Sequence, residues 1–241
     1  SGLILGIKIW REEVNKNDYF RLSRKPLVIG ISGDSGSGKD TLADSLVKLF
    51  GSQSSVKLSG DDYHLWDRNR PMWKVTTHLN PLANNLELFS NDLIRLIDGK
   101  SIQINHYNHS TGKKSKPEKL KSNDFIIASG LHTLYIPNIR EHLNIKIFLD
   151  MDQELRTYYK IRRDTIKRNH TVEKVIKSIE RRQPDSSKFI ATQKKYADIS
   201  YKLVPADAKR LNYKSNNDIK LRLVVTAKSG TLELQLSRVL I

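Results

Sequence analysis

The sequence of 241 residues contains no cysteine. This absence excludes disulfide bonds, a thiolate nucleophile and zinc sites built from cysteine, and it suits a reducing compartment such as the cytoplasm. No apolar run reaches the roughly 18–20 residues that a membrane-spanning helix needs, and no signal peptide is recognisable. We therefore expect a cytoplasmic protein that does not interact with a membrane.

Acidic residues are few relative to basic ones, with 26 Asp and Glu against 42 Lys and Arg, and the formal net charge is +16. Residues 156–195 alone carry 13 basic and four acidic residues. This excess is compatible with a solvated helical face or with a cluster that gathers phosphate groups. No known nucleic-acid-binding motif accompanies the charge, so we expect no nucleic acid as a partner.

One glycine-rich segment stands between an apolar run at 27–31 and an apolar-periodic stretch at 42–50. The order strand, glycine loop and helix is typical of a phosphate-binding loop. Backbone N–H groups and the positive helix end then face an anion, and a lysine reaches the terminal phosphates. The expected nucleotide-binding residues are Gly33, Ser35, Gly36, Ser37, Gly38, Lys39, Asp40 and Thr41.

The residue after the loop lysine is unusual. A Ser or Thr normally stands there, and its hydroxyl binds Mg²⁺. This chain has Asp40 instead. The segment is therefore a phosphate-binding loop in which a carboxylate replaces the hydroxyl that normally binds the metal ion.

The rest of the pattern alternates between strand and helix. We expect strands at 27–32, 55–59, 125–129, 145–150 and 198–204, and helices at 39–50, 82–98, 152–169 and 172–182. Near-continuous apolar strands and this alternation predict an α/β fold, a doubly wound, mainly parallel sheet with helices on both faces. Ligands bind at the carboxyl ends of the strands in such folds.

Three further segments have their own character. Residues 1–26 are predicted to form a leader packed on or preceding the core, with an edge strand or a docking helix as alternatives. Residues 101–121 are expected to form a surface hairpin or loop. Polar–apolar alternation on both sides of Lys228-Ser229-Gly230 predicts a C-terminal antiparallel β-hairpin within 206–241, as an extension of the domain at 27–205.

An acidic pair follows the second predicted strand. Asp61 and Asp62 lie where that strand ends, next to the phosphate-binding loop in the predicted sheet. A carboxylate in this place can accept a proton from an attacking hydroxyl.

Further motifs follow one another along the chain in the order in which they occur in one protein family. They are Asp61–Arg68, His78–Asn85, Tyr107–Gly112, Gly130-Leu131-His132, Lys160–Asp164, Ser178–Asp185 and Gln193–Asp198. With them, residues 27–205 resemble the phosphoribulokinase/uridine kinase family of P-loop kinases, and the phosphoribulokinase branch more closely.

The resemblance implies roles for individual residues. Asp61 matches the base that takes the proton of the acceptor hydroxyl, near Mg²⁺, and Arg163 and Asp164 match a pair needed for turnover. Lys39, the lysine that reaches the terminal phosphates, is expected to be catalytic as well. Arg181 and Arg182 fall in a mobile lid, at about 178–195, that closes over ATP. The residues that match substrate-binding positions are His64, Arg68, Tyr107, His109, Lys160 and Arg168. His78 and His132 are expected to be structural.

Ser129 departs from the family pattern, which has a Glu at the end of the third strand. Because Asp40 gains a carboxylate where Ser129 loses one, we interpret the two as a reciprocal exchange in a metal site formed by Asp40, Asp61 and Ser129. Mg²⁺ accepts such oxygen ligands. Loss of catalysis is the competing interpretation.

These features predict an enzyme that needs ATP and Mg²⁺ and phosphorylates a hydroxyl of a small phosphorylated sugar similar to ribulose 5-phosphate. A uridine-type nucleoside kinase is the first alternative. A non-catalytic nucleotide-binding domain of a longer protein is the second. The sequence leaves a homodimer open.

Overall fold

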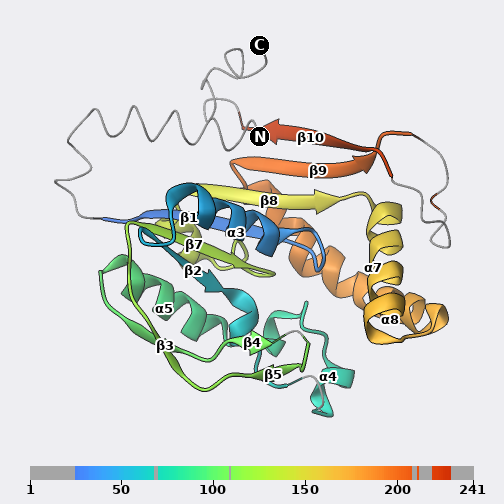
Figure 1. Cartoon of the computed structure of the whole chain (residues 1–241), viewed down its shortest axis with the longest axis horizontal. Helices are drawn as coiled ribbons and strands as arrows, with labels where there is room; N and C mark the ends of the chain where they lie inside the picture. The colour runs from blue at the N-terminus through green and yellow to red at the C-terminus, as the bar shows by residue number, and fades with distance from the viewer. Residues whose placement is uncertain (1–24, 68–69, 109, 208–210, 212–218, 229–241) are drawn as a thin grey trace.

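The computed structural model describes residues 25–67, 70–108, 110–207, 211 and 219–228. A six-stranded sheet runs through the centre in the order β10-β9-β8-β1-β7-β2 (Figure 1). Its strands are β1 (Leu27–Gly33), β2 (Ser55–Ser59), β7 (Phe125–Gly130), β8 (Ile145–Met151), β9 (Ile199–Pro205) and β10 (Leu221–Ala227). The first five pair in parallel, and β10 is antiparallel to β9. The predicted mainly parallel sheet is confirmed.

Successive strand residues point to opposite sides of the sheet, so these strands present apolar side chains on both faces. Helices cover both faces and bury these side chains. Val28 of β1 belongs to one apolar core with Phe89 and Leu93 of α5 (Leu86–Ile97). Ile29 belongs to a second core with Leu46 of α3 (Lys39–Phe50). The other helices are α4 (Met72–Val75), α6 (Pro137–His142), α7 (Gln153–Arg168) and α8 (Val172–Asp185).

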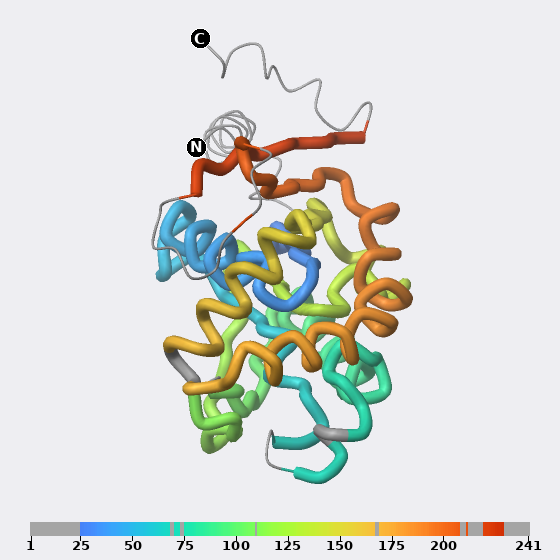
Figure 2. The backbone as a smooth tube through the Cα atoms, turned by 90° about the vertical axis from the view of Figure 1, so that its right-hand side faces the viewer, coloured from blue at the N-terminus to red at the C-terminus, as the bar shows by residue number. Residues whose placement is uncertain are grey.

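The helices α7 and α8 continue from the carboxyl end of β8 and lie at that end of the sheet (Figure 1). They pack against each other beside the loop that joins β1 to α3 (Figure 2). The fold therefore brings the basic segment 156–195 to the phosphate-binding loop.

Two helix boundaries differ from the prediction by more than one residue. The helix expected from residue 82 begins at Leu86, because Pro81–Ala83 forms a separate 3₁₀ turn, η2, and the Asn85 side chain accepts the Leu88 N–H at 3.1 Å as an N-cap. The helix expected to end at 182 continues to Asp185. It then runs into the π-helical η3 (Ser186–Ile190) and the 3₁₀ helix η4 (Ala191–Tyr196).

The segment 101–121 forms two small antiparallel pairs. They are β3 (Ile102–Ile104) with β6 (Glu118–Leu120), and β4 (Tyr107–Asn108) with β5 (Lys113–Lys114). Near the C-terminus, β10 forms within the first arm of the expected hairpin, but it pairs with β9. The second arm of that hairpin and residues 1–24 of the leader lie outside the described residues. No helix in the described ranges combines the length and apolar character needed to cross a membrane.

Candidate active site

The loop between β1 and α3 requires glycine at three places. A Cβ at Gly33 would lie 2.3 Å from the Leu149 carbonyl oxygen, so no side chain fits there. Gly36 and Gly38 have φ of 84° and 93°, in the left-handed region that glycine adopts without strain. The backbone can then wrap into the cradle that a phosphate group needs.

Lys39 begins α3 and folds back across this loop. Its Nζ donates to the Asp34 carbonyl oxygen at 2.8 Å, and only 9% of the residue is exposed. Asp40 and Thr41 follow in the first helical turn and are exposed. The lysine is therefore held at the positive end of α3, where a phosphate group would bind.

A cavity of about 1070 Å³ opens above the loop, and we call it the main cavity. The phosphate-binding loop, the turn after β2, and the helices α7 and α8 supply most of the residues that line it. The predicted site residues that line it are Ser35, Gly36, Gly38, Lys39, Asp40, Thr41, Asp61, His64, Tyr107, Arg163, Asp164, Arg181 and Arg182.

Asp61 stands on η1 (Gly60–Tyr63), the 3₁₀ turn directly after β2. Its Oδ1 lies 3.8 Å from Nε2 of the buried His64. His64 Nδ1 lies 2.7 Å from Asn84 Oδ1, and the Asn84 amide nitrogen donates to two backbone carbonyls. These bonds assign the proton to His64 Nδ1 and leave Nε2 facing Asp61.

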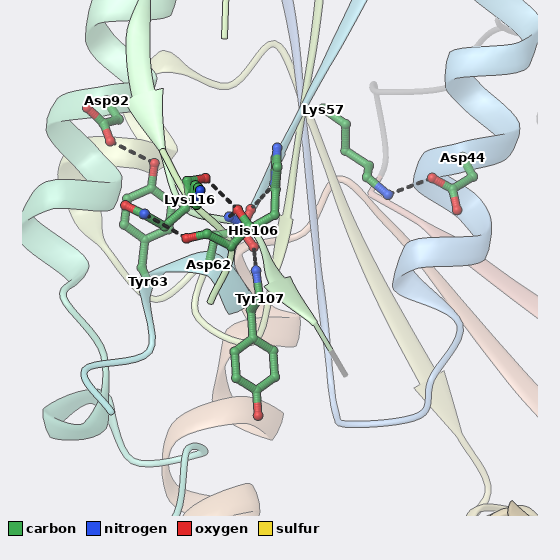
Figure 3. A network of polar contacts seen from close by, with 10 residues as sticks. Asp44, Lys57, Asp62, Tyr63, Asp92, His106, Tyr107 and Lys116 are labelled. Atoms are coloured by element: carbon green, nitrogen blue, oxygen red, sulfur yellow. Dashed lines mark hydrogen bonds and ion pairs between the residues drawn. The ribbon is translucent and has the colours of Figure 1, made fainter. Parts of the chain in front are cut away.

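Asp62 has a different role from its neighbour. Its carboxylate accepts the Tyr107 N–H at 2.6 Å and pairs with His106 Nδ1 at 2.9 Å (Figure 3). Burial raises the pKa of Asp62. The Tyr63 hydroxyl donates to Asp92 of α5 at 2.8 Å in the same region (Figure 3). Asp62 therefore fixes β4, the strand that carries Tyr107 into the cavity wall.

The helices α7 and α8 contribute five cations to the main cavity. We call Arg163, Lys174, Lys177, Arg181 and Arg182 the basic wall. Arg163 Nε donates to Asp164 at 2.8 Å. Burial and the neighbouring Arg181 lower the pKa of Arg182 to about 10. An incoming anion would therefore meet several cations, one of which is already poorly solvated.

Eight further residues line the cavity and were not among the predicted site residues. They are His78, Ser110, Leu131, His170, Lys174, Val175, Lys177 and Ser178. The spacing of Lys174, Lys177 and Arg181 places them on one face of a helix, which is a signal that could have found the two lysines. His78 was expected to be structural but lines the cavity, and burial lowers its pKa well below its usual range. His132 is buried, and its Nε2 lies 2.9 Å from the Leu79 carbonyl.

Other predicted residues lie elsewhere. Gly33, Ser37 and Ser129 are buried and do not line the main cavity. Lys160 faces a separate cavity of about 20 Å³, and burial lowers its pKa to about 8. The predicted residues Arg68 and His109 lie outside the described residues, as does the side chain of Arg168.

The segment after α8 is anchored in the core. Gln193 is fully buried and accepts hydrogen bonds from the Ser32 hydroxyl at 2.7 Å and the Leu134 N–H at 3.0 Å. Ile190 is also fully buried. The lid expected at 178–195 includes these residues, and their burial would restrict any lid movement to the part before Ser186. Movement of that part stays a prediction.

The donor set of the main cavity fits a magnesium ion. Asp40 and Asp61 both line the cavity, and Mg²⁺ is commonly held by one or two carboxylates together with substrate phosphates. Ser129 Oγ is buried and has no hydrogen-bond partner among the described residues, but Ser129 does not line the cavity. The proposed exchange between Asp40 and Ser129 therefore stays a prediction.

Comparison with known sequences identifies relatives along most of the chain. Residues 28–209 match the sequence model of the Phosphoribulokinase / Uridine kinase family. A phosphoribulokinase of Synechocystis is 37% identical over 198 residues, which cover 82% of this chain and 59% of that protein. A uridine kinase of Ligilactobacillus salivarius is 31% identical, over 84% of this chain and 92% of that protein.

Among solved structures, the phosphoribulokinase from Rhodobacter spheroides is similar, with a TM-score of 0.65 and 21% identity, over 78% of this chain and 74% of that one. This likeness concerns the fold. The chain spans less than two thirds of the Synechocystis phosphoribulokinase and 53% of the one from Chlamydomonas reinhardtii. On the match over residues 28–209, the chain belongs to the phosphoribulokinase/uridine kinase family.

Proposed function

We propose that the chain is an ATP- and Mg²⁺-dependent kinase that transfers the γ-phosphoryl group to a hydroxyl of a phosphorylated sugar, ribulose 5-phosphate or a close relative. The observation that carries the proposal is the main cavity, in which a phosphate-binding loop, the Asp61 carboxylate and the basic wall meet. The cytoplasmic location and the absence of a nucleic-acid partner belong to the same proposal.

The residues divide the work of phosphoryl transfer between them. Loop N–H groups and Lys39 hold the terminal phosphates of ATP, while Asp61 accepts the proton of the attacking hydroxyl. His64, whose Nε2 lies 3.8 Å from Asp61 Oδ1, stands next to this base and would help to position the acceptor. The basic wall stabilises the charge on the transferring group. When bound, Mg²⁺ neutralises phosphate charge, and Asp40 and Asp61 would hold it.

The charge of the cavity favours an acceptor that carries its own phosphate. Six Lys and Arg side chains and three Asp side chains line the cavity among the described residues. A magnesium–ATP complex alone leaves part of this positive charge unbalanced, and a sugar phosphate would balance more of it. The similarity to phosphoribulokinases points to the same class of acceptor. Arg68, His109, Lys160 and Arg168 remain predicted contacts of that acceptor.

Uridine is the second candidate acceptor. The observation in its favour is the uridine kinase relative, because 92% of that protein aligns with this chain. A neutral nucleoside would leave more of the basic wall without a counter-charge, and for this reason we place it second.

The experiment is an ATP-consumption screen over ribulose 5-phosphate, other sugar phosphates and uridine. We expect turnover with a pentose phosphate that Asp61→Asn abolishes. Asp98→Asn, which removes an exposed carboxylate paired with Lys100, is the matched control and should keep full activity. Turnover of uridine alone would assign a nucleoside kinase, and ATP binding without any turnover would assign a non-catalytic nucleotide-binding domain.

A further inference from the structure

The Asp34 side chain joins the phosphate-binding loop to the two basic helices. One carboxylate oxygen accepts the Ser35 N–H at 2.6 Å. The other accepts hydrogen bonds from Arg156 Nη1, in the first turn of α7, and from the Ser186 hydroxyl, directly after α8. The Asp34 carbonyl oxygen is also the acceptor for Lys39 Nζ. Asp34 thus contacts the loop, the loop lysine, the N-terminal end of α7 and the residue that follows the C-terminal end of α8.

The surroundings of this carboxylate are strongly cationic. The cavity of about 20 Å³ beside Asp34 is also lined by Arg156, Lys160 and Arg182, and Asp34 is the one acidic side chain among its described lining residues. The charge of Asp34 acts to raise the pKa of both Lys160 and Arg182, against the larger lowering effect of burial. Asp34 thus offsets the repulsion among these three cations, and Asp164 adds to the effect at Lys160 and Arg182.

The contacts of Asp34 connect to the main cavity through the chain. Arg182 lines both cavities, and Ser186 follows α8, the helix that carries Lys174, Lys177 and Arg181. Arg156 lies two turns before Arg163 on α7. A displacement of Asp34 would therefore alter the distance between the phosphate-binding loop and the basic wall.

From these contacts we infer that Asp34 is a positioning residue that holds the phosphate-binding loop against the basic wall in the arrangement that binds ATP. The inference rests on the proposed function, because it assumes that ATP is the ligand of the loop. Hydrogen bonds to a charged carboxylate are stronger than those between neutral groups, and several of them on one side chain fix the arrangement.

Electrostatics and positioning predict opposite results when the carboxylate is removed. Asp34 is an anion beside a site for polyphosphate, so Coulomb repulsion alone predicts tighter ATP binding by Asp34→Ala. Positioning predicts weaker binding, because the loop and the basic wall are no longer held together.

The test measures ATP affinity by titration calorimetry, and thermal unfolding in parallel. We expect Asp34→Ala to weaken ATP binding about tenfold and Ser186→Ala, a smaller change, about threefold. Ser186→Ala should add little when Asp34 is already Ala, because the two share one contact. Asp44→Ala, which breaks the exposed Asp44–Lys57 pair of 2.6 Å, is the matched control and should leave ATP affinity unchanged.

The outcomes distinguish failure of the positioning role of Asp34 from failure of the proposed kinase function. Tighter or unchanged ATP binding by Asp34→Ala and Ser186→Ala, whatever happens to the unfolding temperature, would overturn the positioning role and leave the proposed function intact. A wild-type protein that binds no ATP would instead refute the proposed function, and the positioning role with it. Weakened binding with non-additive effects supports both.

Discussion

Asp61 and Asp62 are neighbours in the chain, yet their carboxylates meet different surroundings. Asp61 lines the main cavity and keeps 23% of its side chain exposed, whereas Asp62 is buried and holds the backbone N–H of Tyr107. The 3₁₀ turn after β2 separates the two side chains. This local conformation therefore places the Asp61 carboxylate in the proposed active site and the Asp62 carboxylate in the interior, where it holds β4.

The variants Asp61→Ala and Asp62→Ala should accordingly fail in different ways. Asp61→Ala should lower kcat by at least about 100-fold with little change in unfolding temperature, because it removes a proton acceptor from a solvated position. Asp62→Ala should lower the free energy of unfolding by about 1–3 kcal/mol, because it leaves the Tyr107 N–H unsatisfied. Steady-state kinetics and thermal unfolding of both variants check this. Equal loss of stability in the two would contradict the assignment.

At the scale of elements, α8 presents a periodic basic face to the main cavity. Lys174, Lys177 and Arg181 recur at the spacing of a helix face, and all three line the cavity. Thr171 caps the helix, since its hydroxyl accepts the Lys174 N–H at 3.3 Å. At the other end, the buried Gln193 anchors the segment that follows. The face is thereby held toward the phosphate-binding loop.

Neutralising this face should weaken the binding of phosphorylated ligands. We expect the double variant Lys174→Gln/Lys177→Gln to raise the KM for ATP or for the phosphorylated acceptor about tenfold, because each exposed cation contributes up to about 1 kcal/mol.

A control pair separates local contact from net charge. Lys48→Gln/Lys119→Gln removes the same charge from two exposed lysines, one on α3 and one on β6. It should leave both KM values nearly unchanged. If the two double variants behaved alike, the effect would come from overall charge and the basic wall would lose its role.

At the scale of the whole molecule, stability should depend on pH through Lys160. Burial, together with nearby Arg182, lowers the pKa of Lys160 to about 8 in the folded protein, below its ordinary value of 10.5. Between these two values the unfolded chain binds more protons than the folded one. The contribution of Lys160 to stability therefore increases as the pH rises from about 8 to 10.5.

Comparison with Lys160→Met isolates this contribution. The stability of the wild type relative to the variant should improve by about 1–3 kcal/mol between pH 7 and pH 10. Denaturant unfolding at both pH values measures it. A difference that stays constant with pH would show that Lys160 is solvated in the folded protein.

Much of this molecule could be predicted from local patterns. The order of apolar strand, glycine loop and amphipathic helix predicted β1, the phosphate-binding loop and α3, because strand burial, left-handed glycines and helix periodicity all act within a few residues. The alternation of strands and helices predicted the parallel sheet, because a helical crossover brings the chain back to start the next strand in the same direction. Where a local signal was subtle, as with the Asn85 cap that begins α5, the boundary was wrong.

The fold class, the phosphate-binding loop, the family motifs and the excess of positive charge all follow from the order of residues along the chain. Three features come instead from the packed fold: Asp61 faces the cavity while Asp62 holds β4, Lys160 lies beside Asp34, and β10 pairs with β9. These features depend on contacts between residues far apart in the chain, and burial and hydrogen-bond geometry fix such contacts only once the sheet and its helices have packed.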